Sequence, residues 1–96
     1  MRSTAVVATD APARYAKQLL AHLGRKDAVE TVGDDADGGR LVFGYGTGTV
    51  TAGEGALTLV ADAPDAEGLA HVQDVLARHL ERFGARRELI VNWEDG

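Results

Sequence analysis

Four side chains that can donate hydrogen bonds recur at every fourth position near the N-terminus: Arg14, Gln18, His22 and Lys26. Positions spaced by four share one face of a helix, so these residues form a row if the segment is helical. Such a row, with Lys17 beside it, suits an anionic ligand or a protein partner. A solvated helix face has the same composition, and the spacing alone leaves both interpretations open.

Three histidines, His22, His71 and His79, are the candidate general bases and metal ligands. No two of them are three or four residues apart, and the chain has no cysteine, so we assign no metal ligand, no cofactor and no catalytic residue. His22 and His79 each lie at the edge of a predicted apolar helix stripe, where we expect a packed or capped ring. If the helices lie side by side, the two rings face each other or share a groove. His71 is expected to project into solvent and to be inert.

Two loops resemble ligand-binding loops in composition only. Residues 44–48 read Gly-Tyr-Gly-Thr-Gly, but a phosphate-binding loop opens onto a helix and this segment lies between predicted strands. The acidic residues Asp34, Asp35 and Asp37 lack the remaining ligands and the entering helix of a calcium loop. A hairpin turn and a solvated turn are the better interpretations.

The net charge of −5 argues against nucleic-acid binding, which requires a basic surface. Most basic residues nevertheless fall on or just after the two predicted helices, so a local positive patch is compatible with the negative total. These residues are Arg14, Lys17, Arg25, Lys26, Arg78, Arg82, Arg86 and Arg87. Because the chain shows neither a signal peptide nor an apolar run of about 20 residues, we expect a cytoplasmic protein.

Two helices are predicted from apolar residues that recur at helical spacing. The first starts at Asp10-Ala11-Pro12, with Pro12 in its first turn and Asp10 as an acceptor for free backbone N–H groups, and it ends near Lys26. The second follows Asp62-Ala63-Pro64 and ends near Phe83, before Gly84. The repeated Asp-Ala-Pro indicates convergent capping more than an internal duplication, since little else matches between the two halves.

Six strands are predicted, at residues 4–9, 28–32, 40–43, 47–52, 56–61 and 88–93, with a turn at residues 33–39. In the last strand Leu89, Val91 and Trp93 are expected to point one way and Glu88, Ile90 and Asn92 the other. The four strands between the helices follow one another too closely for crossover helices, so they should be antiparallel neighbours. The chain is therefore predicted to be a single α+β domain over residues 1–96, in the order β-α-β-β-β-β-α-β. Two helices would pack on one face of an antiparallel sheet, with a TATA-binding-protein-like or a ferredoxin-like topology.

Two segments, Arg14 to Lys26 and His79 to Trp93, resemble a family of small bacterial proteins known only as a domain of unknown function, DUF2218. The resemblance extends over nearly the whole chain. The positions that match the family pattern are Arg14, Tyr15, Lys17, Gln18, His22, Lys26, His79, Leu80, Arg82, Phe83, Arg86, Glu88 and Trp93. The chain departs from the pattern at Leu20, where the family often has cysteine, and at Gly84, Ala85 and Arg87.

The resemblance implies no reaction, but it implies gene neighbours in siderophore transport and hence a role in iron handling. We therefore expect a non-enzymatic binding or accessory module that takes an anionic small molecule or a protein partner. Its predicted surface comprises Arg14, Lys17, Gln18, His22, Lys26, His79, Arg82 and Arg86. Two alternatives stay open: a homodimer formed through a free sheet face with Tyr45 and Trp93, and an enzyme with a histidine general base.

Overall fold

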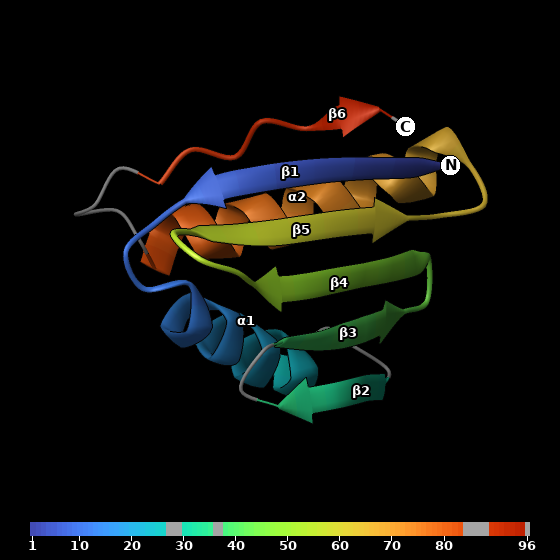
Figure 1. Ribbon diagram of the computed structural model, residues 1–96. Coiled ribbons are helices and arrows are strands. Elements are labelled where there is room, and N and C mark those ends of the chain that lie inside the picture. Colours follow the sequence, from blue (N-terminus) through green and yellow to red (C-terminus); the bar gives the residue numbers. More distant parts are fainter. Residues whose placement is uncertain (27–29, 36–37, 84–88, 96) are drawn as a thin grey trace.

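In the computed structural model, which describes residues 1–26, 30–35, 38–83 and 89–95, six strands form one sheet (Figure 1). In chain order the elements are β1 (Arg2–Ala8), α1 (Pro12–Lys26), β2 (Glu30–Asp35), β3 (Gly38–Phe43), β4 (Gly46–Ala52), β5 (Ala56–Asp62), α2 (Ala66–Phe83) and β6 (Glu94–Asp95). The predicted α+β class and element order are confirmed. The strands between the helices are one or two residues longer than predicted. Residues 28, 29, 36 and 37 lie outside the described residues, and β2 and β3 occupy the rest of the predicted turn at residues 33–39.

The strand order is β2-β3-β4-β5-β1-β6, and all the strand pairs are antiparallel. The first strand therefore pairs with the fifth, from Arg2 opposite Asp62 to Ala8 opposite Ala56. A ferredoxin-like fold has two strands between its helices, whereas this chain has four. The observed order is thus that of the TATA-binding-protein-like alternative.

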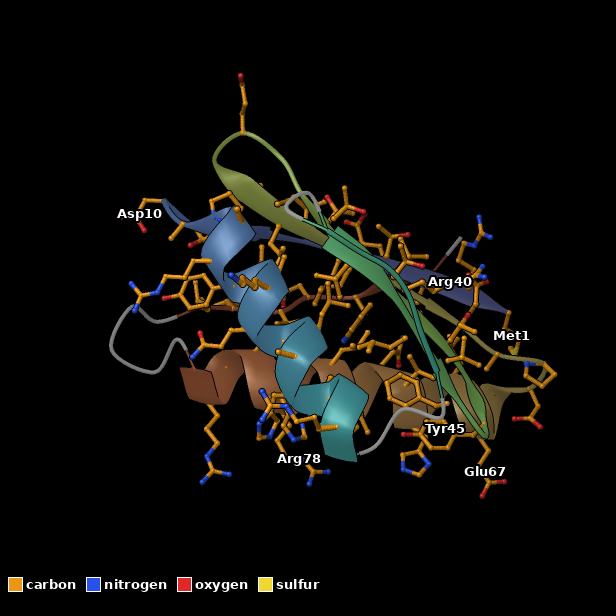
Figure 2. All side chains as sticks on the ribbon, turned by 90° about the horizontal axis from the view of Figure 1, so that it is seen from below. Met1, Asp10, Arg40, Tyr45, Glu67 and Arg78 are labelled. Carbon is orange, nitrogen blue, oxygen red and sulfur yellow. The ribbon has the colours of Figure 1, made fainter. Side chains whose placement is uncertain are left out.

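Both helices cover the same face of the sheet (Figure 2). In α1 the predicted apolar face is confirmed, because Tyr15, Ala16, Leu19, Leu20 and Leu23 are all buried. Pro12 is the first residue of the helix, as predicted, where its missing N–H group leaves no hydrogen bond unmade. Burial of this face against the sheet leaves Arg14 and Gln18 of the polar row exposed, and His22 half-buried.

The start of α2 differs from the prediction. Asp62 is the last residue of β5 and forms an ion pair with Arg2, with 3.0 Å between Arg2 Nε and Asp62 Oδ1. The capping residue is Asp65, whose Oδ1 accepts a hydrogen bond from the Gly68 N–H group at 2.7 Å. The second Asp-Ala-Pro therefore ends a strand, while the first leads directly into a helix. The predicted stripe of α2 is buried at Leu69, Val72, Leu76 and Leu80.

The strands alternate between a buried and an exposed face, so the core lies between the sheet and the helices. Inward-facing residues such as Val7, Leu41, Val50 and Leu59 are fully buried. The outer face is rich in threonine and valine, and Val6 is 65% exposed there. No helix of the described residues has the length and hydropathy that crossing a membrane requires.

The C-terminal segment was predicted as a strand over residues 88–93, and this extent is wrong, because regular pairing is confined to β6. Its predicted alternation does hold. Leu89 is buried and Val91 and Trp93 pack on the core, whereas Ile90 is exposed. The segment thus covers the core with alternate side chains without forming a regular ladder to β1, and Glu88 lies outside the described residues.

Candidate functional site

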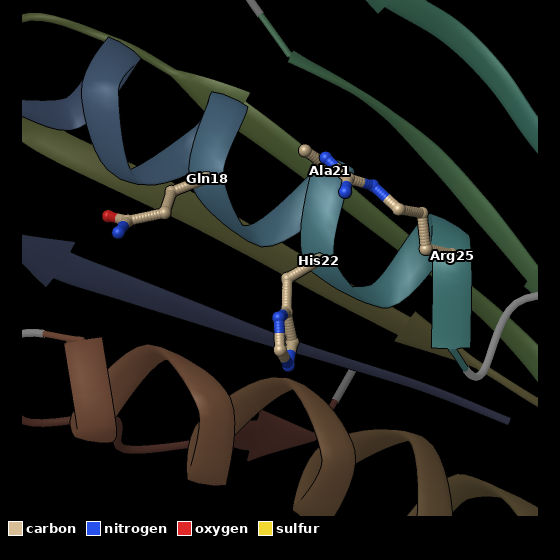
Figure 3. Close-up of a pocket in the computed structure, with 4 residues that line it drawn as sticks. All are labelled: Gln18, Ala21, His22 and Arg25. Atoms are coloured by element: carbon tan, nitrogen blue, oxygen red, sulfur yellow. The ribbon is translucent and has the colours of Figure 1, made fainter.

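A groove of about 290 Å³ lies on the outer surface of α1, and its described lining residues are Gln18, Ala21, His22 and Arg25 (Figure 3). These positions fall three, four and seven residues after Gln18, so they occupy one face of the helix. Ala21 leaves space between longer side chains, and Arg25 supplies a charged donor. We call this feature the α1 groove.

His22 connects the α1 groove to the second helix. Its ring points toward α2 (Figure 3), and its centroid lies 5.1 Å from that of the His79 ring, with 47° between the ring planes. Both histidines are half-buried. The convergence expected for two helices lying side by side is therefore observed. We call these two residues the histidine pair.

The orientation of the His79 ring is set by the backbone of its own helix. Its Nδ1 atom lies 2.8 Å from the carbonyl oxygen of Val75, one turn earlier. Because a carbonyl oxygen only accepts, Nδ1 carries the hydrogen in this contact and Nε2 of a neutral ring keeps its lone pair. The prediction of a packed or capped histidine thus describes His79 well.

The other predicted site residues are less tightly organised. Arg14 and Lys17 are exposed on α1, and Arg82 is exposed near the end of α2. Lys26 ends α1, but its side chain lies outside the described part of the chain, and so does Arg86. Among the described residues the structure therefore brings together Gln18, His22 and His79, with the exposed arginines and lysine at the margins.

Arg25 belongs to the α1 groove and was absent from the predicted surface. The row at every fourth position picked out Gln18 and His22 but not a residue three positions after His22. Since i, i+3 neighbours share a helix face as closely as i, i+4 neighbours, a search at both spacings would have found it.

A second pocket of about 290 Å³ lies where the β3–β4 turn meets the first turns of α2, and it is lined by Tyr45, Asp65, Glu67 and His71 among others. The Tyr45 ring stacks on Phe43 at 5.3 Å and on His71 at 3.8 Å, both nearly parallel. His71 is exposed, as expected, but the prediction of an inert solvent-facing ring missed its contact with Tyr45. This stack fastens the turn to the helix.

The chemistry available in the α1 groove is hydrogen-bond donation and positive charge. None of its described lining residues is a carboxylate or a hydroxyl nucleophile. Across the described part of the chain, no three His, Cys, Asp or Glu side chains gather as a metal-binding group. The arrangement can therefore hold an anion without supplying an evident acid–base pair.

Comparisons with known proteins show a family and a solved structure that the chain resembles. The family described as "Uncharacterized protein conserved in bacteria (DUF2218)" matches residues 4–94. The NMR structure of PA4090 from Pseudomonas aeruginosa is 32% identical, with a TM-score of 0.78 over 97% of this chain and 94% of that one. No curated protein matches the chain.

Proposed function

We propose that this chain, which belongs to the bacterial DUF2218 family, is a non-enzymatic module that binds an anionic small molecule in its α1 groove. The observation that carries the proposal is the lining of the groove. Gln18, His22 and Arg25 place three hydrogen-bonding side chains around one concave surface, and one of them is a guanidinium. An arginine fork matches the geometry of a carboxylate or a phosphate.

The charge distribution supports an anion at this position in spite of the net charge of −5. Arg14 and Lys17 are exposed on the same helix and extend the positive region past Gln18. Among its described lining residues, the groove itself holds the guanidinium group of Arg25. The groove would thus attract an anion that the rest of the protein repels.

The size of the α1 groove favours a small ligand. Ligand pockets generally enclose about 300–1,000 Å³, and this groove lies at the lower limit. Carboxylate or catecholate groups of a siderophore would fit this chemistry, and the gene neighbours that the family resemblance implies give that class its support. We propose siderophore-linked iron handling as the finer form of the function.

The two alternatives have less support. The homodimer interpretation placed Tyr45 and Trp93 on a free sheet face, but both residues pack against the core. An interface there would consist mainly of threonine and valine side chains such as Thr49 and Val6, with the exposed Arg40 among them. The enzyme interpretation gains the proximity of His22 and His79, yet the described groove offers no nucleophile for either ring to activate.

The test is isothermal titration calorimetry of metal-free protein, treated with EDTA, against phosphate, citrate, and metal-free and ferric siderophores. We expect one ligand of the panel to bind at 1:1 stoichiometry. Arg25→Ala should weaken that binding by about tenfold or more, because a hydrogen bond to a charged group contributes about 1.5–3 kcal/mol. Arg14→Ala should weaken it less, since its charge lies at the margin.

Arg40→Ala is the matched control, because Arg40 is also an exposed arginine but lies on the face of the sheet that the helices leave uncovered. Its affinity should equal that of the wild type. If Arg40→Ala and Arg25→Ala weaken anion binding equally, the affinity depends on the overall charge of the protein and the α1 groove is not the binding site. If no anion binds, the proposal of a small anionic ligand is wrong, and a protein partner becomes the next candidate.

A further inference from the structure

The histidine pair combines three features that are usual at a metal site. His22 and His79 come from different helices, so their convergence is independent of the spacing in the sequence, which had argued against a metal. Their ring centroids are 5.1 Å apart. Two nitrogen atoms that share one zinc ion each lie about 2.0–2.1 Å from it. The ring separation of 5.1 Å is short enough for both rings to reach one ion.

The second feature is the hydrogen bond of His79. Histidine ligands generally donate their other ring N–H group to a carboxylate, a carbonyl or water, which fixes the tautomer and the ring orientation. The contact of His79 Nδ1 with the Val75 carbonyl oxygen at 2.8 Å is of this kind. It presents Nε2, the nitrogen with the lone pair, as the ligand atom.

The third feature is access. The α1 groove adjoins His22, so an ion and its remaining ligands can reach the pair from solvent. We propose that His22 and His79 together bind one divalent transition-metal ion of the copper, nickel and zinc class. Imidazole nitrogens favour these metals, whereas calcium and magnesium require oxygen ligands.

A site with two protein ligands leaves coordination positions for water or for donor atoms of a bound small molecule. No described Asp, Glu or third histidine joins the pair, so such positions would be open. The positive charge of Arg25 disfavours a metal ion nearby, and an anion bound in the α1 groove would offset the charge of Arg25. The inference does not depend on the anion, however, and the metal ion alone is its probe.

The test uses tag-free protein, cleared of metal with EDTA, in a buffer without phosphate or citrate. Zn²⁺ is titrated by calorimetry, and Cu²⁺ is added at one equivalent for electron paramagnetic resonance. We expect one Zn²⁺ ion per chain and a Cu²⁺ spectrum with two coordinated ring nitrogens. His22→Ala and His79→Ala should each weaken Zn²⁺ binding by more than about tenfold, because removal of even an outer-shell partner costs 10- to 100-fold.

His71→Ala is the control, since it removes an exposed imidazole from the far end of α2. It should bind Zn²⁺ as the wild type does. If circular dichroism shows that His79→Ala does not fold, the test rests on the two variants His22→Ala and His22→Gln. The inference is overturned if the wild type binds no Zn²⁺, if the His22 variants bind it unchanged, or if His71→Ala loses it equally. Anion binding by the EDTA-treated protein is measured separately, so either proposal can fail alone.

Discussion

At the scale of single residues, two glycines allow the β3–β4 turn to lie directly on α2. A Cβ atom on Gly46 would lie 2.5 Å from the Asp62 carbonyl oxygen and 2.8 Å from Val72 Cγ2. A Cβ atom on Gly68 would lie 2.5 Å from the Tyr45 carbonyl oxygen. All three distances are shorter than those that real Cβ atoms show, so a residue larger than glycine at either position must displace its neighbours.

We predict that Gly46→Ala and Gly68→Ala each lower the free energy of unfolding by about 1–3 kcal/mol, the usual cost of overpacking. Gly44→Ala is the matched control, because a Cβ atom there meets nothing within 4 Å. Urea denaturation followed by circular dichroism measures all three. A stability of Gly46→Ala equal to that of Gly44→Ala would mean that the turn moves away from α2 at no cost.

These contacts could not be predicted from the sequence. The composition of residues 44–46 was sufficient to predict a turn, because glycine is frequent in turns. It could not show that the turn touches α2, since Val72 lies 26 positions after Gly46 and no local pattern links them. The stacking of His71 on Tyr45 escaped prediction for the same reason.

At the scale of elements, the two helices begin in different ways although both follow Asp-Ala-Pro. In α1 the proline is the first helical residue, whereas in α2 the proline precedes the capping residue Asp65. The tripeptide therefore predicted that a helix would follow, but not the residue at which it starts. Periodicity did better, because the apolar stripes of both helices are the buried ones.

Asp65→Ala should lower the free energy of unfolding by about 1 kcal/mol, because the Gly68 N–H group would lose its acceptor. Asp74→Ala, on the same helix, removes only the exposed ion pair with Arg78 and should cost no more than about 0.5 kcal/mol. Thermal and urea denaturation compare the two. Equal losses would show that Asp65 contributes through charge and not as a cap.

The candidate site was half predictable at this scale. Gln18 and His22 share a helix face by spacing alone, and that much was read directly from the sequence. The approach of His79 depends on how α1 and α2 pack on the sheet, which spacing within one helix does not encode. Spacing within each helix contains no metal motif, and it gives no information about which residues of the two helices come together.

At the scale of the whole molecule, the element order and the antiparallel pairing followed from turn lengths, and both are observed. The position of β1 in the sheet was not predictable in this way, because its partners β5 and β6 are separated from it by more than forty residues of sequence. Likewise, the C-terminal alternation was correct, but a strand of six residues was not, because Leu89, Val91 and Trp93 pack without regular pairing.

The strand order also predicts the folding transition state. Strands β2 to β5 pair with neighbours in sequence, whereas β1 pairs across more than forty residues with β5. Because closing a long loop costs entropy, we expect a high φ-value for Val50→Ala in β4 and a value near zero for Val7→Ala in β1. Both valines are fully buried, so the two truncations are comparable. Stopped-flow kinetics in urea measures both, and equal values would contradict the expected order.

This arrangement has a consequence for the nascent chain on the ribosome. Strand β1 leaves the exit tunnel well before its partner β5, which has emerged only after residue 62. Until then β1 presents both edges, and an unpaired edge can add to a strand of another chain. Helix α1, which follows at once, likewise waits for β3 and β4 before its apolar face is covered. Strand β1 and helix α1 are thus made well before the strands that cover them, and the length of their exposure during synthesis is set by the order of the strands.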